Sequence, residues 1–153
     1  MKKIALSSLV IMTLVLLTSC QMSRTAITTD EFTAAAEAAG YTVEDMSDQF
    51  DSETTKNFLF AFKDGAEYQI EFSVMTTVGE TESVYETARE LFESKKGNTS
   101  MYSSMAIGNY AFYTLSTGGK YYVISRTDNT YIRVVADTKY KEEISAFLKS
   151  IGY

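Results

Sequence analysis

Apolar residues recur along the chain with two different periods, and the changes between these periods outline its secondary structure. Residues 68–74 alternate strictly between apolar and polar, which is typical of a half-buried β-strand. Asp64-Gly65 before them predicts a hairpin with residues 58–62. Residues 79–96 instead carry apolar side chains at helical spacing, namely Val84, Ala88, Leu91 and Phe92.

Two further helices are predicted near the ends of the domain. Thr28 and Glu31 have the spacing of a capping box, and the helix that they begin should end at Gly40. The last helix should follow Asp137 and present one apolar side, formed by Tyr140, Ile144, Phe147, Leu148 and Ile151.

Three strands joined by tight turns should follow Asn109. Gly118-Gly119 and Asp128-Asn129 tolerate the positive φ that two-residue hairpin turns require. Weaker strands are expected at residues 41–43 and 101–107. This order predicts an α+β domain with three helices packed on a mostly antiparallel sheet of about six to seven strands.

The N-terminus follows a third pattern, an apolar run of 14 residues from Ile4 to Leu17 behind the basic Lys2 and Lys3. A helix that crosses a bilayer needs about 20 residues, so the run is short for a permanent span. A basic start, an apolar centre and small polar residues at the end are the layout of a secretory signal. The run is followed closely by Cys20, the only cysteine of the chain.

Leu17-Thr18-Ser19-Cys20 resembles the lipobox of bacterial lipoproteins, in which a leucine and two small residues precede a cysteine. The resemblance implies cleavage between Ser19 and Cys20, and a diacylglyceryl group on the Cys20 thiol, with or without a further N-acyl chain. Two acyl chains hold a protein stably on a bilayer. An ordinary secretory signal with an incidental cysteine is the alternative.

The resemblance divides the chain into a cleaved signal peptide (1–19), a lipidated cysteine with a short tether (20–27) and a single globular domain (28–153). It implies a place on the extracytoplasmic face of the cell membrane, or of the outer membrane if the host has two. Phrases such as Ala-Gly-Tyr-Thr-Val at 39–43 also resemble small lipoproteins of Gram-positive bacteria. The only attached group that we expect is the covalent lipid on Cys20. No cofactor is expected.

The charge of the chain argues against nucleic acid as a partner. Lys2 and Lys3 precede Cys20, so the part from Cys20 onward has 12 basic and 20 acidic residues and a net charge near −8. A surface of that sign repels phosphate backbones. The loop at 44–56 is rich in carboxylates but lacks the glycine of a calcium-binding loop, which favours a solvated loop over a metal site.

Most catalytic arrangements fail because the necessary residues are missing. The chain has no histidine, its one cysteine is the expected lipidation site, and no Ser-x-x-Lys occurs. A hydrolase with paired carboxylates would need two close acids in a cleft. The sequence therefore favours a protein that is not an enzyme.

A ligand face is expected in the meander if both turns are two-residue loops. One side would then carry Phe112 and the apolar residues that pack under helices. The other side would carry three tyrosines and two arginines, which could stack on a sugar or peptide and hold anionic groups. These residues are Tyr113, Tyr122, Arg126, Tyr131 and Arg133. The alternative is that they only support the sheet.

The sequence as a whole predicts a membrane-anchored, extracytoplasmic binding or interaction module, with a small molecule, a glycan or a protein as partner. The alternative function is a structural or chaperone-like protein that assists envelope assembly. A deep pocket on the sheet face would favour the first function, and a broad exposed apolar patch the second.

Lipidation can be tested in bacterial cells with labelled palmitate. The protein should incorporate the label and stay with the membrane fraction, because a thiol is the acceptor of the lipid. Cys20→Ala should lose both properties, whereas Ser19→Ala, which keeps a small residue before the cysteine, should retain them. Equal labelling and equal membrane association of the Cys20→Ala protein would contradict the lipid anchor.

Overall fold

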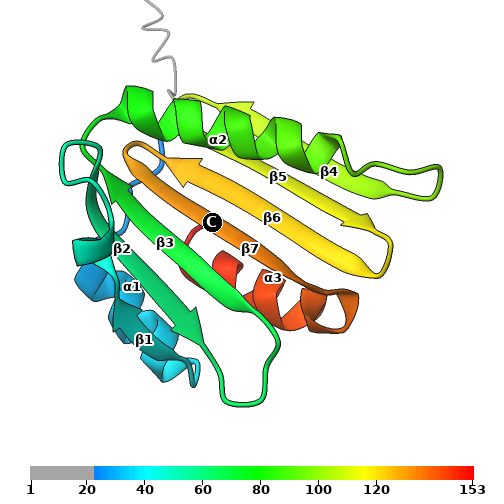
Figure 1. Ribbon diagram of the computed structural model, residues 1–153, viewed down its shortest axis with the longest axis horizontal. Coiled ribbons are helices and arrows are strands. Elements are labelled where there is room, and N and C mark those ends of the chain that lie inside the picture. Colours follow the sequence, from blue (N-terminus) through cyan, green and yellow to red (C-terminus); the bar gives the residue numbers. More distant parts are fainter. Residues whose placement is uncertain (1–22) are drawn as a thin grey trace, which may run out of the picture.

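The computed structural model describes residues 23–153, so the predicted signal peptide and Cys20 lie outside the described residues (Figure 1). The helices are α1 (Thr29–Ala38), α2 (Val78–Glu93) and α3 (Lys141–Ser150). Two short 3-10 helices are η1 (Ser47–Gln49) and η2 (Thr138–Tyr140). The strands are β1 (Thr42–Asp45), β2 (Thr55–Phe62), β3 (Gln69–Met75), β4 (Met101–Ile107), β5 (Tyr110–Thr117), β6 (Lys120–Thr127) and β7 (Thr130–Asp137).

All seven strands form one antiparallel sheet in the order β1-β2-β3-β7-β6-β5-β4. Helices α1 and α3 lie behind the sheet in Figure 1, and α2 lies across its front. The predicted α+β fold, with three helices on a mostly antiparallel sheet, is confirmed. Because α2 connects β3 to the far edge strand β4, the chain returns through β5 and β6 until β7 pairs with β3.

The two predicted tight turns set the register of the meander. Gly118 and Gly119 join β5 to β6 with φ of 56° and 78°, and Asp128 begins the β6–β7 turn with φ of 50°. These angles lie in the left-handed region, which glycine adopts without strain and aspartate tolerates. Each turn contains two residues, as predicted, so the residues that flank it lie directly opposite each other.

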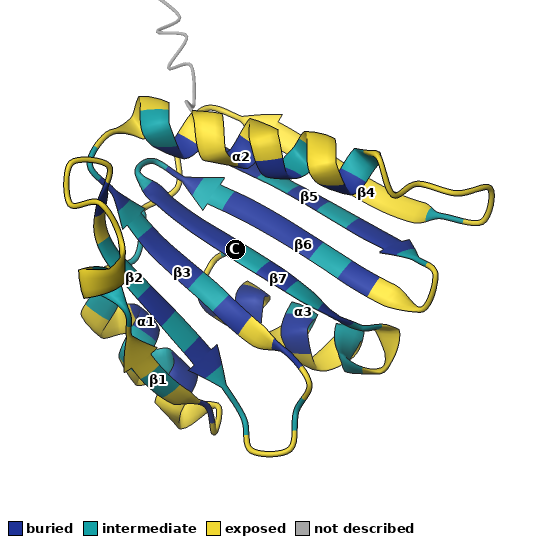
Figure 2. Cartoon of the chain, in the orientation of Figure 1, coloured by how far each residue is buried: buried dark blue, intermediate teal, exposed yellow. Residues whose placement is uncertain are grey.

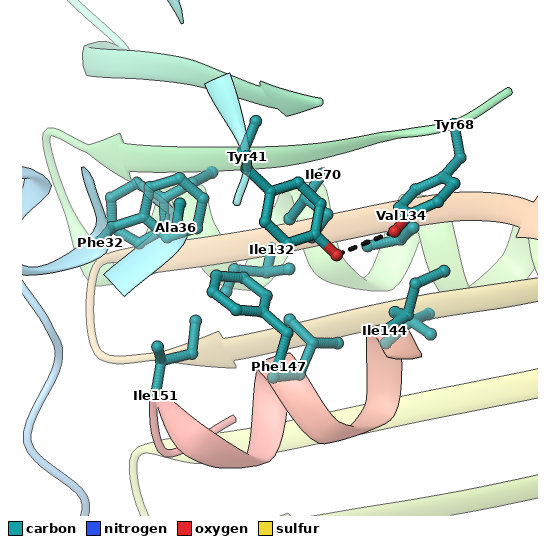
Figure 3. Close-up of a cluster of buried hydrophobic side chains, with 14 of the residues drawn as sticks. Phe32, Ala36, Tyr41, Tyr68, Ile70, Ile132, Val134, Ile144, Phe147 and Ile151 are labelled. Atoms are coloured by element: carbon teal, nitrogen blue, oxygen red, sulfur yellow. Dashed lines mark hydrogen bonds between the residues drawn. The ribbon is translucent and has the colours of Figure 1, made fainter. Parts of the chain in front are cut away.

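The larger core lies between the sheet and helices α1 and α3 (Figure 3). Phe32 of α1 stacks on Phe72 of β3 with ring centroids 4.4 Å apart, and both side chains are fully buried. Tyr41 and Tyr68 share a hydrogen bond of 2.8 Å between their hydroxyls. Their polar ends therefore satisfy each other inside an apolar environment. Phe147 of α3 closes the cluster, with its ring centroid 5.1 Å from that of Tyr41.

The smaller core lies under α2, on the other face of β5, β6 and β7. Ala88 and Phe92 are buried there as expected, but Val84 and Leu91 are 37% and 50% exposed. At ~100° per residue, the apolar stripe of α2 spans about 120°, and Val84 and Leu91 lie at one side of it. The sheet covers only the other side of the stripe, which includes Tyr85.

The segment before α1 is attached to the domain from Arg24 onward. The Arg24 backbone N–H donates to Asn109 Oδ1 at 2.9 Å, and Asn109 Nδ2 donates back to the Arg24 carbonyl at 2.8 Å. The Arg24 guanidinium donates to the Gly152 carbonyl and lies 3.5 Å from the centre of the Tyr110 ring. The expected tether 20–27 is therefore docked on the domain at Arg24.

Each core brings together many buried residues of the described part. This part consequently has the buried apolar surface that an independently folding domain requires. None of its helices is long and apolar enough to span a membrane. Across residues 23–153, no group of three or more His, Cys, Asp or Glu side chains is placed to hold a metal ion.

The Phe32–Phe72 stack should contribute strongly to stability. Phe72→Ala in the 23–153 domain should lower the free energy of unfolding by about 3–5 kcal/mol, because it removes a large buried side chain and leaves a cavity. Urea unfolding followed by circular dichroism measures this change. Val78→Ala, at an exposed position of α2, should change it by less than about 0.5 kcal/mol. Equal effects of the two substitutions would contradict the assignment of the core.

Candidate ligand-binding groove

The five residues of the expected ligand face lie on the same side of the sheet. Arg126 of β6 lies opposite Tyr131 of β7. Ile124, two residues before Arg126 on β6, lies opposite Tyr113 of β5 on one side and Arg133 of β7 on the other. Successive residues of a strand point to opposite faces, so this register places Tyr113, Tyr122, Arg126, Tyr131 and Arg133 together. That side is the one on which α2 packs.

Helix α2 covers much of this face, so the five residues do not form an open platform. Tyr113 and Tyr131 are only 1% and 4% exposed. Tyr122 packs against Phe92 of α2, with ring centroids 4.9 Å apart. Arg126 is also largely buried, and its guanidinium forms an ion pair of 3.0 Å with Glu82 of α2.

The part of the face that stays open is a groove between α2 and strands β2 and β3. Its volume is about 580 Å³, which lies within the range of small-molecule sites. Tyr131 and Arg133 of the expected face line it. The other lining residues are Phe50, Thr54, Thr55, Phe58, Glu71, Ser73, Met75, Glu80, Ser83, Val84, Thr87, Ala88 and Leu91.

The two sides of the groove are apolar. On the sheet side, Phe50 stacks on Phe58 with ring centroids 4.0 Å apart, and Phe60 meets Phe58 edge to face at 5.0 Å. On the helix side, the exposed Val84 and Leu91 form the rim. Burial of such side chains against an apolar ligand is favourable by about 25 cal/mol per Å² of surface removed from water.

A polar centre lies between these apolar sides. Glu71 of β3 and Arg133 of β7 are cross-strand partners, and their side chains form an ion pair of 2.6 Å. The neighbouring cross-strand pair is Ser73 and Tyr131. Four polar side chains thus form a compact group on the sheet, next to the aromatic side of the groove.

The Tyr131 hydroxyl is the exceptional member of this group. It is buried and has no hydrogen-bond partner among the described residues. Burial raises the pKa of Tyr131, so the hydroxyl stays protonated at neutral pH and can donate a hydrogen bond. A buried hydroxyl without a partner is unfavourable by about 1–3 kcal/mol, and an acceptor placed in the groove would remove that penalty.

The groove is fixed at one end by the beginning of α2. Thr77 and Glu80 form a capping box, in which the Glu80 carboxylate accepts the Thr77 backbone N–H at 3.0 Å. The Thr76 hydroxyl donates to the Glu53 carbonyl at 2.8 Å and also contacts the Glu80 carboxylate. These bonds hold the start of α2 against the loop that precedes β2.

The groove offers groups that can bind a ligand. No histidine or cysteine lines it, because the chain has no histidine and its only cysteine, Cys20, lies outside the described residues. The Glu71 carboxylate is paired with Arg133. The arrangement can exclude water, hold an apolar group and direct hydrogen-bond donors at a polar one.

Sequence reasoning identified Tyr131 and Arg133 but missed the apolar sides of the groove. Phe50 lies in what was expected to be a polar loop, and its stacking on Phe58 is a contact between separate segments. The exposed positions of α2 carried a signal, because Val84 and Leu91 lie seven residues apart at one side of the apolar stripe.

Comparisons with known proteins assign the chain to no family. No protein-family model matches the sequence, and no curated protein matches it. A solved structure that resembles the chain is that of a GTP binding regulator from Thermotoga maritima. The two share 14% sequence identity over 82% of this chain and 87% of that chain, with a TM-score of 0.46. A likeness at this level supports no statement about function, which therefore has to be argued from the groove itself.

The capping box predicts a pH dependence of stability. Hydrogen bonds from the Thr76 hydroxyl, and then from Thr77, lower the pKa of Glu80 below its ordinary value. A carboxylate with a lowered folded-state pKa stabilises the protein above its unfolded pKa, about 4.3, and loses this effect as the pH falls. Glu80→Gln should therefore destabilise the 23–153 domain at pH 7 and make little difference at pH 3.

Urea unfolding at both pH values measures this difference. Glu90→Gln, at an exposed glutamate of the same helix, is the matched control and should have little effect at either pH. If Glu80→Gln lowered the free energy of unfolding equally at pH 7 and pH 3, the ionised Glu80 carboxylate would not be what holds the start of α2.

Proposed function

We propose that this protein is a lipid-anchored, extracytoplasmic binding module without enzymatic activity, and that its ligand is a small amphiphile held in the groove. The ligand has an apolar body and a neutral polar head. The observation that carries this proposal is the Tyr131 side chain, which lines a groove with apolar sides and whose buried hydroxyl is unpartnered within the described residues.

The charges around the groove favour a neutral head over an anionic one. The Arg133 guanidinium is already paired with Glu71, and Arg126 with Glu82. Glu80 adds a further carboxylate to the lining. An anionic head would therefore meet more negative than positive charge, whereas a hydroxyl or carbonyl group could accept a hydrogen bond from Tyr131 at no electrostatic cost.

The lipid anchor is supported by the lipobox-like sequence Leu17-Thr18-Ser19-Cys20. Only four residue steps separate Cys20 from Arg24, which is docked on the domain. At ~3.5 Å per residue, these steps span at most about 14 Å. An acylated Cys20 would thus keep the domain close to the bilayer surface, where amphiphiles are concentrated.

A groove on the sheet face favours a binding module over the alternative role in envelope assembly. Its volume of about 580 Å³ suits a small molecule, whereas stable protein–protein contacts bury about 1,200–2,000 Å² of surface. The aromatic stack on one side and the aliphatic rim on the other also fit a narrow apolar chain placed between them.

Binding can be measured with the 23–153 domain and the neutral apolar dye N-phenyl-1-naphthylamine. The dye should fluoresce on binding and be displaced by monopalmitoylglycerol more effectively than by palmitate, because the tails are equal and only the heads differ in charge. Val84→Asp should weaken binding at least about tenfold, since it places a charge on the apolar rim. Val78→Asp, exposed on the same helix outside the groove, should not.

Tyr131→Phe separates the two parts of the proposal. It should leave dye binding intact and should not lower stability, because the lost hydroxyl is buried without a partner in the free domain, and it should weaken displacement by monopalmitoylglycerol about 3–10-fold. Displacement that is insensitive to both Val84→Asp and Tyr131→Phe, or that favours palmitate, would contradict the assignment of ligand and site.

A further inference from the structure

Strand β4 forms an edge of the sheet that lacks the usual protection against pairing. All seven of its residues are exposed, as Figure 2 illustrates. Within residues 23–153, no strand pairs with β4 on the side away from β5. Edge strands usually avoid further pairing by being short, by carrying lysine or proline, or by bulging. Met101–Ile107 has no charge and no proline, and its register with β5 is unbroken.

The opposite edge of the sheet provides an internal comparison. Strand β1 has only four residues, and it ends in the acidic pair Glu44-Asp45. Its shortness and charge are two of the features that block edge-to-edge pairing. The same sheet thus protects one edge and leaves the other open.

Four of the exposed side chains of β4 are large and apolar. Met101 is 66% exposed, Tyr102 61%, Met105 44% and Ile107 41%. Alternation along the strand places Met101, Met105 and Ile107 on the face of α1 and α3, and Tyr102 on the face of α2. An apolar strip that runs along an open edge is typical of an interaction surface.

The turn after β4 determines which backbone groups point outward. Gly108 and Asn109 form a two-residue turn, with Ile107 opposite Tyr110. The two residues that flank such a turn are hydrogen-bonded to each other through their backbones. Along the strand, every second residue then bonds to β5, and the residues between them point their backbone groups away from β5. The backbone N–H and C=O groups of Tyr102, Ser104 and Ala106 are therefore directed at the free edge.

We propose that β4 pairs antiparallel with β4 of a second copy of this chain, so that two sheets join into one across a two-fold axis. The register that pairs all seven residues places Ser104 opposite Ser104 of the second copy. In this register Tyr102 lies opposite Ala106, and both present outward backbone groups. Residues with outward backbone groups therefore lie opposite one another along the whole pairing, as antiparallel hydrogen bonding requires.

The side chains of this register complement each other. Large residues lie opposite small ones in two of the pairs, Tyr102 with Ala106 and Met105 with Ser103. In the third pair, Met101 and Ile107 are both apolar. Although each copy carries a net charge near −8 from Cys20 onward, the strand itself is neutral, so its own side chains bring no like charges together. A contact of this kind is isologous, as two-fold symmetry requires.

The size of the contact predicts a weak dimer. A seven-residue strand is about 23 Å long at ~3.3 Å per residue, and pairing along it buries on the order of 1,000 Å² in total. That area is at the lower limit for a specific interface. If the proposed lipid anchor confines both copies to one membrane, the raised effective concentration would favour the pairing further.

Disulfide trapping tests the register directly. The 23–153 domain has no cysteine, so Ser104→Cys introduces a single thiol. Hydrogen-bonded partners in an antiparallel pair have Cα atoms about 5.5 Å apart, within the range that a disulfide bridges. Mild oxidation should therefore convert most of this variant to a covalent dimer on a non-reducing gel.

Two single-cysteine controls distinguish specific pairing from random collision. Ser103→Cys lies diagonal to its own copy, about 7–8 Å away, and should be trapped several-fold more slowly. Thr42→Cys, on the protected edge strand β1, should stay monomeric. Equal trapping at all three positions, or none at Ser104, would overturn the proposal.

Proline substitution tests the same contact without a disulfide. Ser104→Pro removes an N–H that points to the free edge, which an edge strand tolerates, whereas Ser104→Ala keeps it. Sedimentation of the otherwise unmodified domain should show a concentration-dependent dimer that Ser104→Ala retains and Ser104→Pro loses, with both variants folded by circular dichroism. A monomer at all concentrations, or a dimer that survives Ser104→Pro, would also overturn it.

Discussion

The sheet is wider than the helices that cover it, and the open surfaces of the molecule follow from this mismatch. Strands β3, β6 and β7 carry buried residues on both faces, so both faces need a cover. Helices α1 and α3 supply one cover, and α2 supplies the other mainly across β5, β6 and β7. The groove lies over β2 and β3, where α2 leaves the sheet uncovered. Strand β4, at the far edge, is left exposed by all three helices.

Local chemistry was enough to predict most of the fold. The capping box at Thr28 and the two-residue turns of the meander act between near neighbours, and each was found as predicted. The predicted alternation of residues 68–74 holds as far as Phe72, whereas Ser73 is buried and lines the groove. The order of the strands beyond the meander depends on how α2 crosses the sheet, which no local pattern encodes. The same is true of Phe50, whose partner Phe58 belongs to another segment.

The candidate site shows the same division. Strand periodicity correctly placed three tyrosines and two arginines on one face. It could not reveal that α2 would bury Tyr113, or that each arginine would pair with a carboxylate from another element. Because of those contacts, the ligand that we propose has a neutral head and an apolar body. The sequence had instead led us to expect a ligand with anionic groups on an open platform. Of the five residues, Tyr131 and Arg133 line the groove.

The central claim, that the groove receives a neutral amphiphile, is tested most directly by photolabelling of the full-length protein in its membrane. A monoacylglycerol with a diazirine in its acyl chain should label peptides that contain Phe58 of β2 and Val84 or Leu91 of α2, and excess monopalmitoylglycerol should suppress the labelling. Labelling spread evenly over α1, α3 and the groove, or unchanged by the competitor, would contradict the claim.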